Sequence, residues 1–435
     1  MYLALPPLAA AVAVYRWRRL RSAHHIVGFL LTCVSGTILG AFISLLYARA
    51  TDTRAPLGQI LLTIYLAVAV LSLLKGISWL LKEGIDRLLR VRKRPAAPPG
   101  APPPLPSAWR PWREAGGVML RAGILFAFGL PYVMAVVMVY RPKVTGIENP
   151  TQQLGFPFEP VEFTTSDGLR IDGWWVPAHD IGPPGAALRD PLWGKRTVVL
   201  CHGLGANKGN QFVLARELVP GGFNVLAFDF RAHGESGGHT TSFGDLERRD
   251  VLAAVHWVRE HRASASEKIF GLGVSMGGAA LLGAAADDSA DGRAIDAVAV
   301  VNTYDDLGSL ADSLADRFLA PPFNYVGTHV AVPIASVHAG SNLSAFRPAA
   351  KVDALAPRPL LVVHGRGDLT IKFDHGQRLF EAASQPKLRL WVGKLDKSGQ
   401  FLDRNGAVAD HNGVILSDDA SKSIRIFFEG GRQIL

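Results

Sequence analysis

Apolar and polar residues are arranged in two different ways along this chain, and the pattern changes near residue 141. The first part contains three long runs without a charged residue, of 23, 20 and 19 residues, at 26–48, 55–74 and 122–140. In the second part, short runs rich in Val, Ile, Leu and Phe alternate with stretches whose apolar residues recur at helical spacing. The pattern predicts a membrane region over 1–141 and a domain of alternating strands and helices over 155–435.

Each uncharged run is long enough to be a membrane-spanning helix, because about 20 residues at 1.5 Å per residue cross the hydrocarbon layer. Buried core helices are the alternative, but three such runs within 141 residues favour spans. Pro131 in the third run is compatible with a kinked span. Residues 1–15 are apolar but short, and their basic residues follow the apolar part, which is the wrong order for a cleaved signal peptide. We expect them to form a further short or half-inserted segment.

The charge is divided as unevenly as the hydropathy. Residues 1–141 hold 17 of the 46 Lys and Arg but only 4 of the 37 Asp and Glu, whereas the remaining residues carry 29 basic and 33 acidic side chains. Basic residues between apolar runs indicate membrane topology and argue against a nucleic-acid partner. With the basic loops 16–25 and 75–121 in the cytoplasm, three spans place the C-terminal domain on the extracytoplasmic side. The Ala, Arg and Pro content is typical of a bacterial chain, so we expect a multi-pass protein of a bacterial inner membrane.

The segment 76–107 has two parts. "ISWLLKEGIDRLLRVRKR" has the pattern of a basic amphipathic helix that lies on the membrane surface, and "PAAPPGAPPPLP" is typical of an extended proline-rich linker. The alternative is that the basic helix continues the second span into the cytosol.

The C-terminal domain begins with two alternating stretches, "VEFTT" and "LRIDGWWVP", that flank the turn residues "SDG" and predict a hairpin. Six further strands are predicted where apolar runs end at Gly, Pro or polar residues: 196–202, 223–230, 268–275, 297–302, 359–365 and 388–393. Apolar strands that alternate with helices predict an α/β fold with a mostly parallel sheet covered on both faces. Ligands of such sheets bind beyond the carboxyl ends of the strands.

The stretch "GLGVSMGG", residues 271–278, is the densest group of glycines in the domain. It is not a dinucleotide loop, because Met276 stands where the third glycine of G-x-G-x-x-G would be, and no G-K-[ST] follows. A close-packed turn would explain the glycines but not the serine. Gly273-Val274-Ser275-Met276-Gly277 matches G-x-S-x-G, in which a sharp turn between a strand and a helix exposes a nucleophilic serine. We therefore predict Ser275 as the nucleophile.

A serine nucleophile needs a histidine base and a carboxylate that orients it. Asp368 ends a later strand, 93 residues after Ser275, and His411 follows 43 residues further on. This is the chain order expected for a serine on such a turn. Asp410 is a rival acid, but a sequence neighbour rarely points at the same imidazole. The backbone N–H groups of Leu204 and Met276 are the predicted oxyanion donors.

With these motifs the chain resembles the α/β-hydrolase superfamily, and it is most similar to the serine aminopeptidase-like and acyl-ester hydrolases that carry an N-terminal membrane anchor. The resemblance covers residues 155–432 and rests on motifs in family order: "SDGLRIDGWWVPA", "HGLGANKG", "DFRAHGESGG", "GVSMGG", "RPLLVVHGRGD" and "DHNG". It implies Ser275 as nucleophile, Asp368 as acid and His411 as base, with oxyanion donors at Leu204 and Met276. It also implies a structural turn at His233, and we expect His202, His364 and His375 to be structural.

Two segments depart from the family pattern. The segment before His411 is long and contains turn residues, which indicates an inserted surface hairpin. Residues 303–346 are apolar enough to form a lid that lines an acyl-binding groove or lies against lipid; an ordinary pair of packing helices is the alternative.

The expected activity is that of a membrane-anchored serine hydrolase that cleaves a carboxylic ester or thioester through an acyl-enzyme. The two alternatives are a serine peptidase on the same fold and a catalytically silent binding module. No metal or organic cofactor is expected, because the histidines and the two cysteines, Cys33 and Cys201, show no metal-ligand spacing. The expected partners are a lipid membrane and a small acyl-ester or lipid substrate.

Overall fold

The computed structural model describes residues 34–41, 67, 71, 130–180, 190–318 and 323–431. The chain divides into two compact units, Met1–Ile124 and Leu125–Leu435. In the first unit the described residues are helical at 34–41, 67 and 71, within the predicted spans 26–48 and 55–74. The segment 1–15, the segment 76–107 and the rest of the predicted spans before residue 130 lie outside the described residues. Over the described ranges, no helix combines the length and the apolar composition that crossing a bilayer requires.

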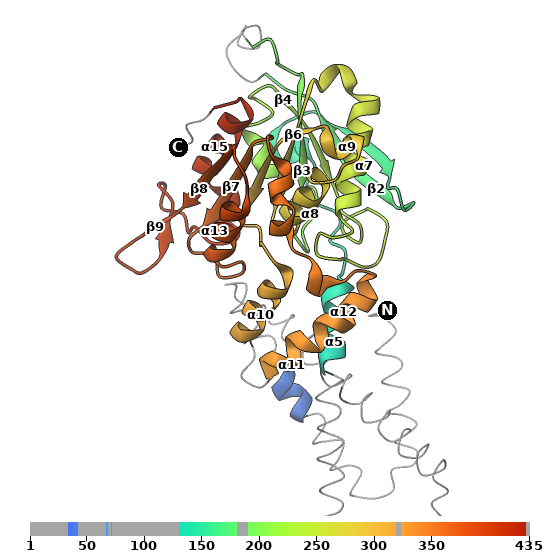
Figure 1. Cartoon of the computed structure of the whole chain (residues 1–435), viewed down its shortest axis with the longest axis vertical. Helices are drawn as coiled ribbons and strands as arrows, with labels where there is room; N and C mark the ends of the chain where they lie inside the picture. Colours follow the sequence, from blue (N-terminus) through green and yellow to red (C-terminus); the bar gives the residue numbers. More distant parts are fainter. Residues whose placement is uncertain are drawn as a thin grey trace, which may run out of the picture. The chain divides into compact units, whose positions relative to one another are not determined.

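The second unit is built around a mixed eight-stranded sheet with the order β1-β2-β4-β3-β5-β6-β7-β8 (Figure 1). The hairpin β1–β2 is antiparallel, β2 pairs antiparallel with β4, and all other neighbours are parallel. The strands are β1 (Glu159–Thr164), β2 (Arg170–Val176), β3 (Arg196–Cys201), β4 (Phe223–Phe228), β5 (Lys268–Val274), β6 (Ile295–Val301), β7 (Leu360–Gly365) and β8 (Lys387–Val392).

These strands confirm the eight that the apolar pattern predicts, with boundaries that differ by a few residues. The strands β3, β4 and β7 are buried along their whole length. They read as continuous apolar runs because helices cover both faces of the sheet, so neither face selects polar residues. The predicted α/β architecture with a mostly parallel sheet is therefore confirmed.

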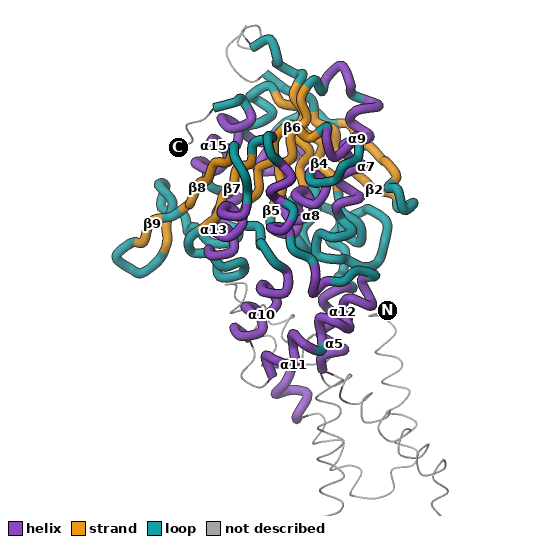
Figure 2. Tube along the Cα trace, viewed as in Figure 1, coloured by secondary structure: helices purple, strands orange, loops and turns teal. Residues whose placement is uncertain are grey.

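Helices cover both faces of the sheet (Figure 2), and a hydrophobic cluster on each face holds the layers together. On one face, α7 (Arg248–His261), α8 (Met276–Ala285) and α13 (Phe373–Ala382) pack on the sheet, and α9 (Ala290–Arg293) lies beside α7 and α8. The other face is covered by the 3₁₀ helix η3 (Phe212–Arg216), α14 (Gly413–Leu416) and α15 (Asp418–Phe428). Because β3 to β8 are mutually parallel, their carboxyl ends lie at the same edge of the sheet.

A third cluster lies beyond this edge and unites helices from distant parts of the chain. Between β6 and β7 the chain forms α10 (Leu307–Phe318), α11 (Phe323–His329) and α12 (Ala331–Ala339), followed by the 3₁₀ turns η5 (Leu343–Ala345), η6 (Pro348–Ala350) and η7 (Val352–Leu355). These helices occupy the segment 303–346 that the sequence predicts as a lid. They pack with α5 (Leu130–Val139), which precedes the hydrolase-like motifs and is followed by α6 (Pro150–Leu154).

The segment before α7 forms a hydrogen-bonded turn that the apolar pattern did not predict. Glu247 accepts hydrogen bonds from the backbone N–H of Ser242 and of Gly244, at 2.9 and 2.8 Å. The Ser242 hydroxyl accepts from the N–H of Leu246 at 2.7 Å, so residues 242–247 close on themselves and the helix begins only at Arg248.

Candidate functional site

Ser275 stands at the junction of β5 and α8 in a conformation that few non-glycine residues adopt. Its φ and ψ are 54° and −120°. Its N–H donates to the Val301 carbonyl at 2.9 Å, and its own carbonyl accepts from the N–H of Gly278 and of Ala279. Backbone strain of this kind persists only where the surroundings enforce it, and it is common at functional sites. The predicted strand–turn–helix context of the serine is present.

Two glycines beside Ser275 explain why this turn is so rich in glycine. A Cβ added to Gly277 would lie 2.3 Å from the Cys201 carbonyl oxygen, and one added to Gly273 would lie 2.6 Å from the Cα of Gly278. Both contacts are with backbone, which cannot move aside. Glycine at these positions therefore allows α8 to begin directly against the end of β3.

The structure joins His411 to Asp368. The Nδ1 atom of His411 lies 2.6 Å from Oδ2 of Asp368, whose other oxygen accepts from the N–H of Thr370 and of Ile371 at 2.8 Å each. Asp368 is buried, so its carboxylate is fixed by both interactions. With Nδ1–H donated to the carboxylate, Nε2 of His411 is left as the acceptor that a general base needs.

The rival acid, Asp410, has a different task. Its Oδ1 accepts hydrogen bonds from the N–H of Asn412 and of Gly413, at 3.1 and 2.7 Å. The carboxylate therefore closes the turn that leads into α14, and the structure places Asp368, not Asp410, against the imidazole.

Ser275 and His411 are held by consecutive residues at the end of β6. The Val301 carbonyl accepts from Ser275, and the Asn302 side chain donates from Nδ2 to the His411 carbonyl at 2.9 Å. No hydrogen bond joins the Ser275 hydroxyl to the His411 ring, although both residues are described. Such a bond is often long before substrate binds.

Asn302 is one of two residues that sequence reasoning missed. It is fully buried with φ of 47°, and its Oδ1 accepts from the N–H of Gly365 at 2.8 Å while Nδ2 reaches the His411 carbonyl. It therefore bridges the loop of Asp368 and the loop of His411. The available signal was an asparagine directly after a buried strand, a residue type that tolerates positive φ.

The loop with the predicted oxyanion donor Leu204 lies beside the serine. A Cβ added to Gly203 would be 3.4 Å from the Cβ of Ser275. Within the described part of the chain, the N–H groups of Leu204 and Met276 have no hydrogen-bond acceptor. Two unpaired donors near a nucleophile are what an oxyanion hole requires.

Lys208 fixes the loop that contains Leu204 through ion pairs with two carboxylates. Its Nζ lies 2.7 Å from Oδ2 of Asp229 and 2.6 Å from Oδ1 of Asp172, and its backbone N–H donates to Oδ1 of Asp229 at 2.7 Å. The Lys208 side chain is 2% exposed. Burial alone would lower the pKa of Lys208, but the two carboxylates outweigh this effect and raise it. The lysine is therefore charged and clamps the loop to the ends of β2 and β4. Sequence reasoning missed it as well.

Four other histidines hold loops around the site. His202 donates to the Gly203 carbonyl and accepts from the N–H of Phe230, and burial lowers its pKa to about 3. His233 accepts from the N–H of Gly205 at 3.1 Å, and burial lowers its pKa as well.

The remaining two histidines, His364 and His375, make contacts near the loop of Asp368. His364 contacts the Ile371 carbonyl at 2.9 Å. His375 is joined through Nδ1 to Oδ1 of Asp305, which also accepts from Arg378. These contacts are structural, as expected for all four histidines.

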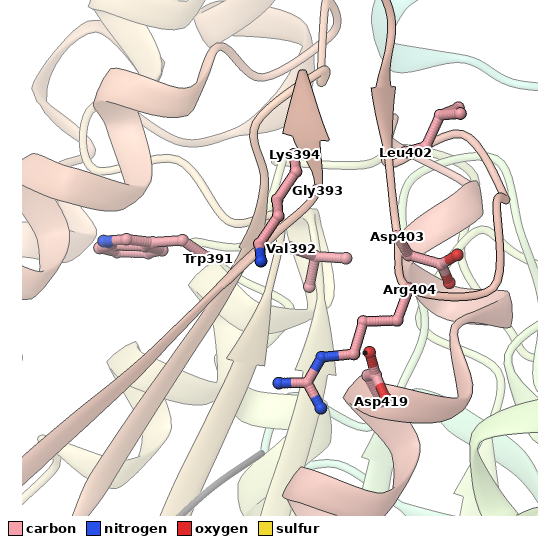
Figure 3. Close-up of a pocket in the computed structure, with 8 residues that line it drawn as sticks. All are labelled: Trp391, Val392, Gly393, Lys394, Leu402, Asp403, Arg404 and Asp419. Carbon is pink, nitrogen blue, oxygen red and sulfur yellow. Dashed lines mark ion pairs between the residues drawn. The ribbon is translucent and has the colours of Figure 1, made fainter. Parts of the chain in front are cut away.

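The predicted surface hairpin before His411 is confirmed. The short strands β9 (Lys394–Leu395) and β10 (Phe401–Leu402) pair antiparallel. A small pocket at the base of the hairpin is shown in Figure 3, with Arg404 beside Asp419 at 3.5 Å. None of the three predicted catalytic residues lines it, and its lining residues are Trp391, Val392, Gly393, Lys394, Leu402, Asp403, Arg404 and Asp419.

Comparison with known proteins agrees with the fold. The family described as "alpha/beta hydrolase fold" matches residues 196–331. The uncharacterized protein YfhR of Escherichia coli O157:H7 is 29% identical over 229 residues, which are 53% of this chain and 69% of that protein. The uncharacterized protein YqkD of Bacillus subtilis strain 168 is 29% identical over 231 residues, 51% of this chain and 66% of its own. The structure of the Pyrococcus furiosus esterase Pf2001 superposes with a TM-score of 0.51 and 22% identity, covering 68% of this chain and 99% of that one.

Proposed function

Because the chain has the alpha/beta hydrolase fold, we propose that it is a membrane-anchored serine hydrolase that cleaves a carboxylic ester or thioester of an acyl or lipid substrate. The observation that carries the proposal is the His411–Asp368 pair at 2.6 Å, held by Asn302 at the same sheet edge as the strained Ser275. A buried carboxylate that orients an imidazole near a serine is the arrangement that makes a hydroxyl nucleophilic.

In the proposed reaction, the Ser275 hydroxyl attacks the carbonyl carbon while its proton passes to Nε2 of His411. The carbonyl oxygen becomes an oxyanion, which the N–H groups of Leu204 and Met276 stabilise. The tetrahedral intermediate collapses to an acyl-enzyme, and His411 returns the proton to the departing alcohol or thiol. A water molecule then attacks the acyl carbon while His411 takes its proton. His411 returns this proton to the departing Ser275 oxygen, which releases the acid and restores the Ser275 hydroxyl. Asp368 stays ionised throughout and stabilises the imidazolium.

The membrane part of the proposal rests on the sequence. Three uncharged runs of 19 or more residues precede the domain, and the basic loops 16–25 and 75–121 favour an extracytoplasmic C-terminal domain. A C-terminal alkaline phosphatase fusion should be active and a C-terminal green fluorescent protein fusion dark. The reverse result would place the domain in the cytoplasm.

The activity is tested by labelling with a fluorophosphonate, which reacts with activated serines. Wild-type protein should be labelled and Ser275→Ala should not. Asp368→Asn should lose most labelling, whereas Asp410→Asn should keep it, because an Asn amide oxygen can still close the turn. A folded wild type that resists the probe, or equal labelling of the two Asp variants, would contradict the proposed triad.

Substrate class is read from p-nitrophenyl esters of increasing chain length beside aminoacyl anilides. Faster turnover of esters supports the proposal, and faster turnover of anilides would make the protein a peptidase.

A further inference from the structure

The helices α5 and α12 lie side by side, although about 190 residues separate them in the sequence (Figure 1). Ala331, Ala335 and Ala339 recur every fourth residue on one face of α12, and all three are buried, as are Ala135 and Val139 of α5. Small residues at such spacing let two helix backbones approach closely, which is typical of helix pairs in membranes.

The opposite faces of the two helices are apolar as well. We call Tyr132, Val133 and Val137 of α5 together with Val337 of α12 the outer face; all four side chains are exposed, Val337 by 83%. Neither helix contains Asp, Glu, Lys or Arg. The polar residues of α12 are Ser336, whose hydroxyl donates to the Val332 carbonyl at 2.9 Å, and His338, which contacts Tyr140. A helix pair on a water-facing surface would carry polar side chains here, whereas helices that are apolar all round are buried or lie in a membrane.

The C-terminal end of α5 has the residues of a membrane–water boundary. Tyr140 follows the helix directly, its hydroxyl 3.3 Å from Nδ1 of His338, and Arg141 and Lys143 come next. Tyr and basic residues are enriched where a span leaves the hydrocarbon. In the sequence, α5 is the second half of the uncharged run 122–140. Whatever medium surrounds α5 also surrounds α12, since the two helices are packed together.

The inner side of these helices leads to the proposed catalytic site. The cluster that contains Ala135 and Ala335 also contains Ile371, whose N–H holds Asp368, and Leu204 packs against it. The helices that carry the outer face and the candidate oxyanion loop therefore contact the same hydrophobic cluster.

We propose that the outer face of α5 and α12 lies in the hydrocarbon of the bilayer, and that the substrate is the acyl ester of a membrane lipid, taken from that leaflet without passing through water. The choice of lipid over a second protein rests on the uncharged run 122–140 and on the Tyr140–Arg141 boundary. The lipid-substrate half rests on the proposed serine hydrolase function, whereas the membrane contact of α12 does not.

The membrane contact is tested by fluorescence on the full chain. Val337→Cys in a Cys33→Ser background, labelled with the dye NBD, is placed in vesicles of phosphatidylcholine and phosphatidylglycerol; Cys201 is fully buried and should not react. Nitroxide-bearing acyl chains should quench the dye on the order of twofold, because an interfacial helix buries its apolar face within the acyl boundary. Leu395→Cys, on the exposed hairpin away from these helices, is the matched control and should be quenched by aqueous iodide instead.

Two results would overturn the membrane contact. Quenching at residue 337 by iodide alone would place the outer face in water. A dye untouched by either quencher would mean that protein, a second copy or another segment of this chain, covers it.

The substrate class is tested by Val337→Asp. Turnover of a fluorogenic long-chain lipid ester embedded in the same vesicles should fall about tenfold or more, because a carboxylate is costly in hydrocarbon. Turnover of p-nitrophenyl butyrate and fluorophosphonate labelling should stay unchanged, and Leu395→Asp should change neither. Equal loss on both esters, or no loss on either, would overturn entry from the bilayer. A wild type that resists fluorophosphonate defeats the proposed function instead, and the dye measurement still decides the membrane contact.

Discussion

Asn302→Gly is the substitution that most directly probes how the proposed catalytic loops are held. Asn302 accepts from the N–H of Gly365 at 2.8 Å and donates to the carbonyl of His411 at 2.9 Å, with a weaker contact to the Asp410 carbonyl at 3.4 Å. Glycine removes all three contacts. It leaves the backbone unstrained, because φ at this position is 47°.

The magnitude follows from what loses its partner. The Gly365 N–H is buried and would stay unsatisfied, which costs about 1–3 kcal/mol. The His411 carbonyl belongs to a partly exposed residue and can turn to water, so it loses only about 1 kcal/mol. We expect a fall of about 2–4 kcal/mol in the free energy of unfolding. Asn302→Ala should lose about 1 kcal/mol more, because a Cβ disfavours this backbone conformation.

The effect on catalysis should exceed the effect on folding. A base loop that shifts by about 1 Å can lower the rate about 100-fold, because the proton transfer depends on alignment. Asn302→Asp is the sharpest variant: it keeps the size and the acceptor for Gly365 but sets a carboxylate oxygen against the carbonyls of His411 and Asp410.

The measurements are kcat and KM on p-nitrophenyl butyrate, with thermal unfolding in detergent micelles. We expect kcat to fall about 10- to 100-fold in the Gly and Asp variants with little change in KM, at a temperature where both are folded. A folded Asn302→Gly that keeps kcat within about twofold of wild type would refute the reasoning, because the base would then be positioned without Asn302.

Three further predictions concern the same loops. Gly277→Ala should lower the free energy of unfolding by at least about 3 kcal/mol in denaturant titration, because its Cβ would meet backbone at 2.3 Å. Gly283→Ala in the same helix is the control. Its Cβ meets only Arg248 side-chain atoms at 3.4 Å or more, so the change should be neutral or stabilising by up to about 1 kcal/mol. Lys208→Met should lower stability by about 3–5 kcal/mol, because it leaves the buried Asp229 carboxylate unpaired, and should lower kcat through the loosened loop; an unchanged kcat would show that the clamp does not serve the oxyanion site. His202 has a folded pKa of about 3, below its unfolded value, because it is buried as the neutral imidazole. The free energy of unfolding should therefore be unaffected by His202 above pH 6.5 and should fall by up to about 5 kcal/mol as the pH falls toward 3. In His202→Gln the free energy of unfolding should vary less over this pH window.

Much of the fold could be predicted because its signals are local. A strand buried on both faces must be apolar along its length, as β3 and β7 are, and it must end at turn residues. The glycines around Ser275 are local too, since their lack of a Cβ serves a turn of a few residues. The candidate Asp368 followed from its place after a strand, and His411 from its position after Asp368 in the chain.

What stayed hidden depends on contacts between distant residues. Asn302 reads as an ordinary strand-ending residue until β6 is seen between β5 and β7, where its side chain reaches residues 63 and 109 positions away. Lys208 reads as a loop lysine until β2 and β4 bring Asp172 and Asp229 to it.

The sequence by itself determined which segments are strands, which serine stands on a sharp turn, and which carboxylate and histidine follow it in order. Those properties are encoded in residues that are neighbours along the chain, or in periodicities that burial imposes. Only the tertiary structure decided that His411 faces Asp368 and not Asp410, that Asn302 ties their loops together, and that α12 shares a layer with α5. The reason is physical: a hydrogen bond or a packed helix pair depends on distance and direction in space, and a linear pattern specifies neither until the sheet has set the order of its strands.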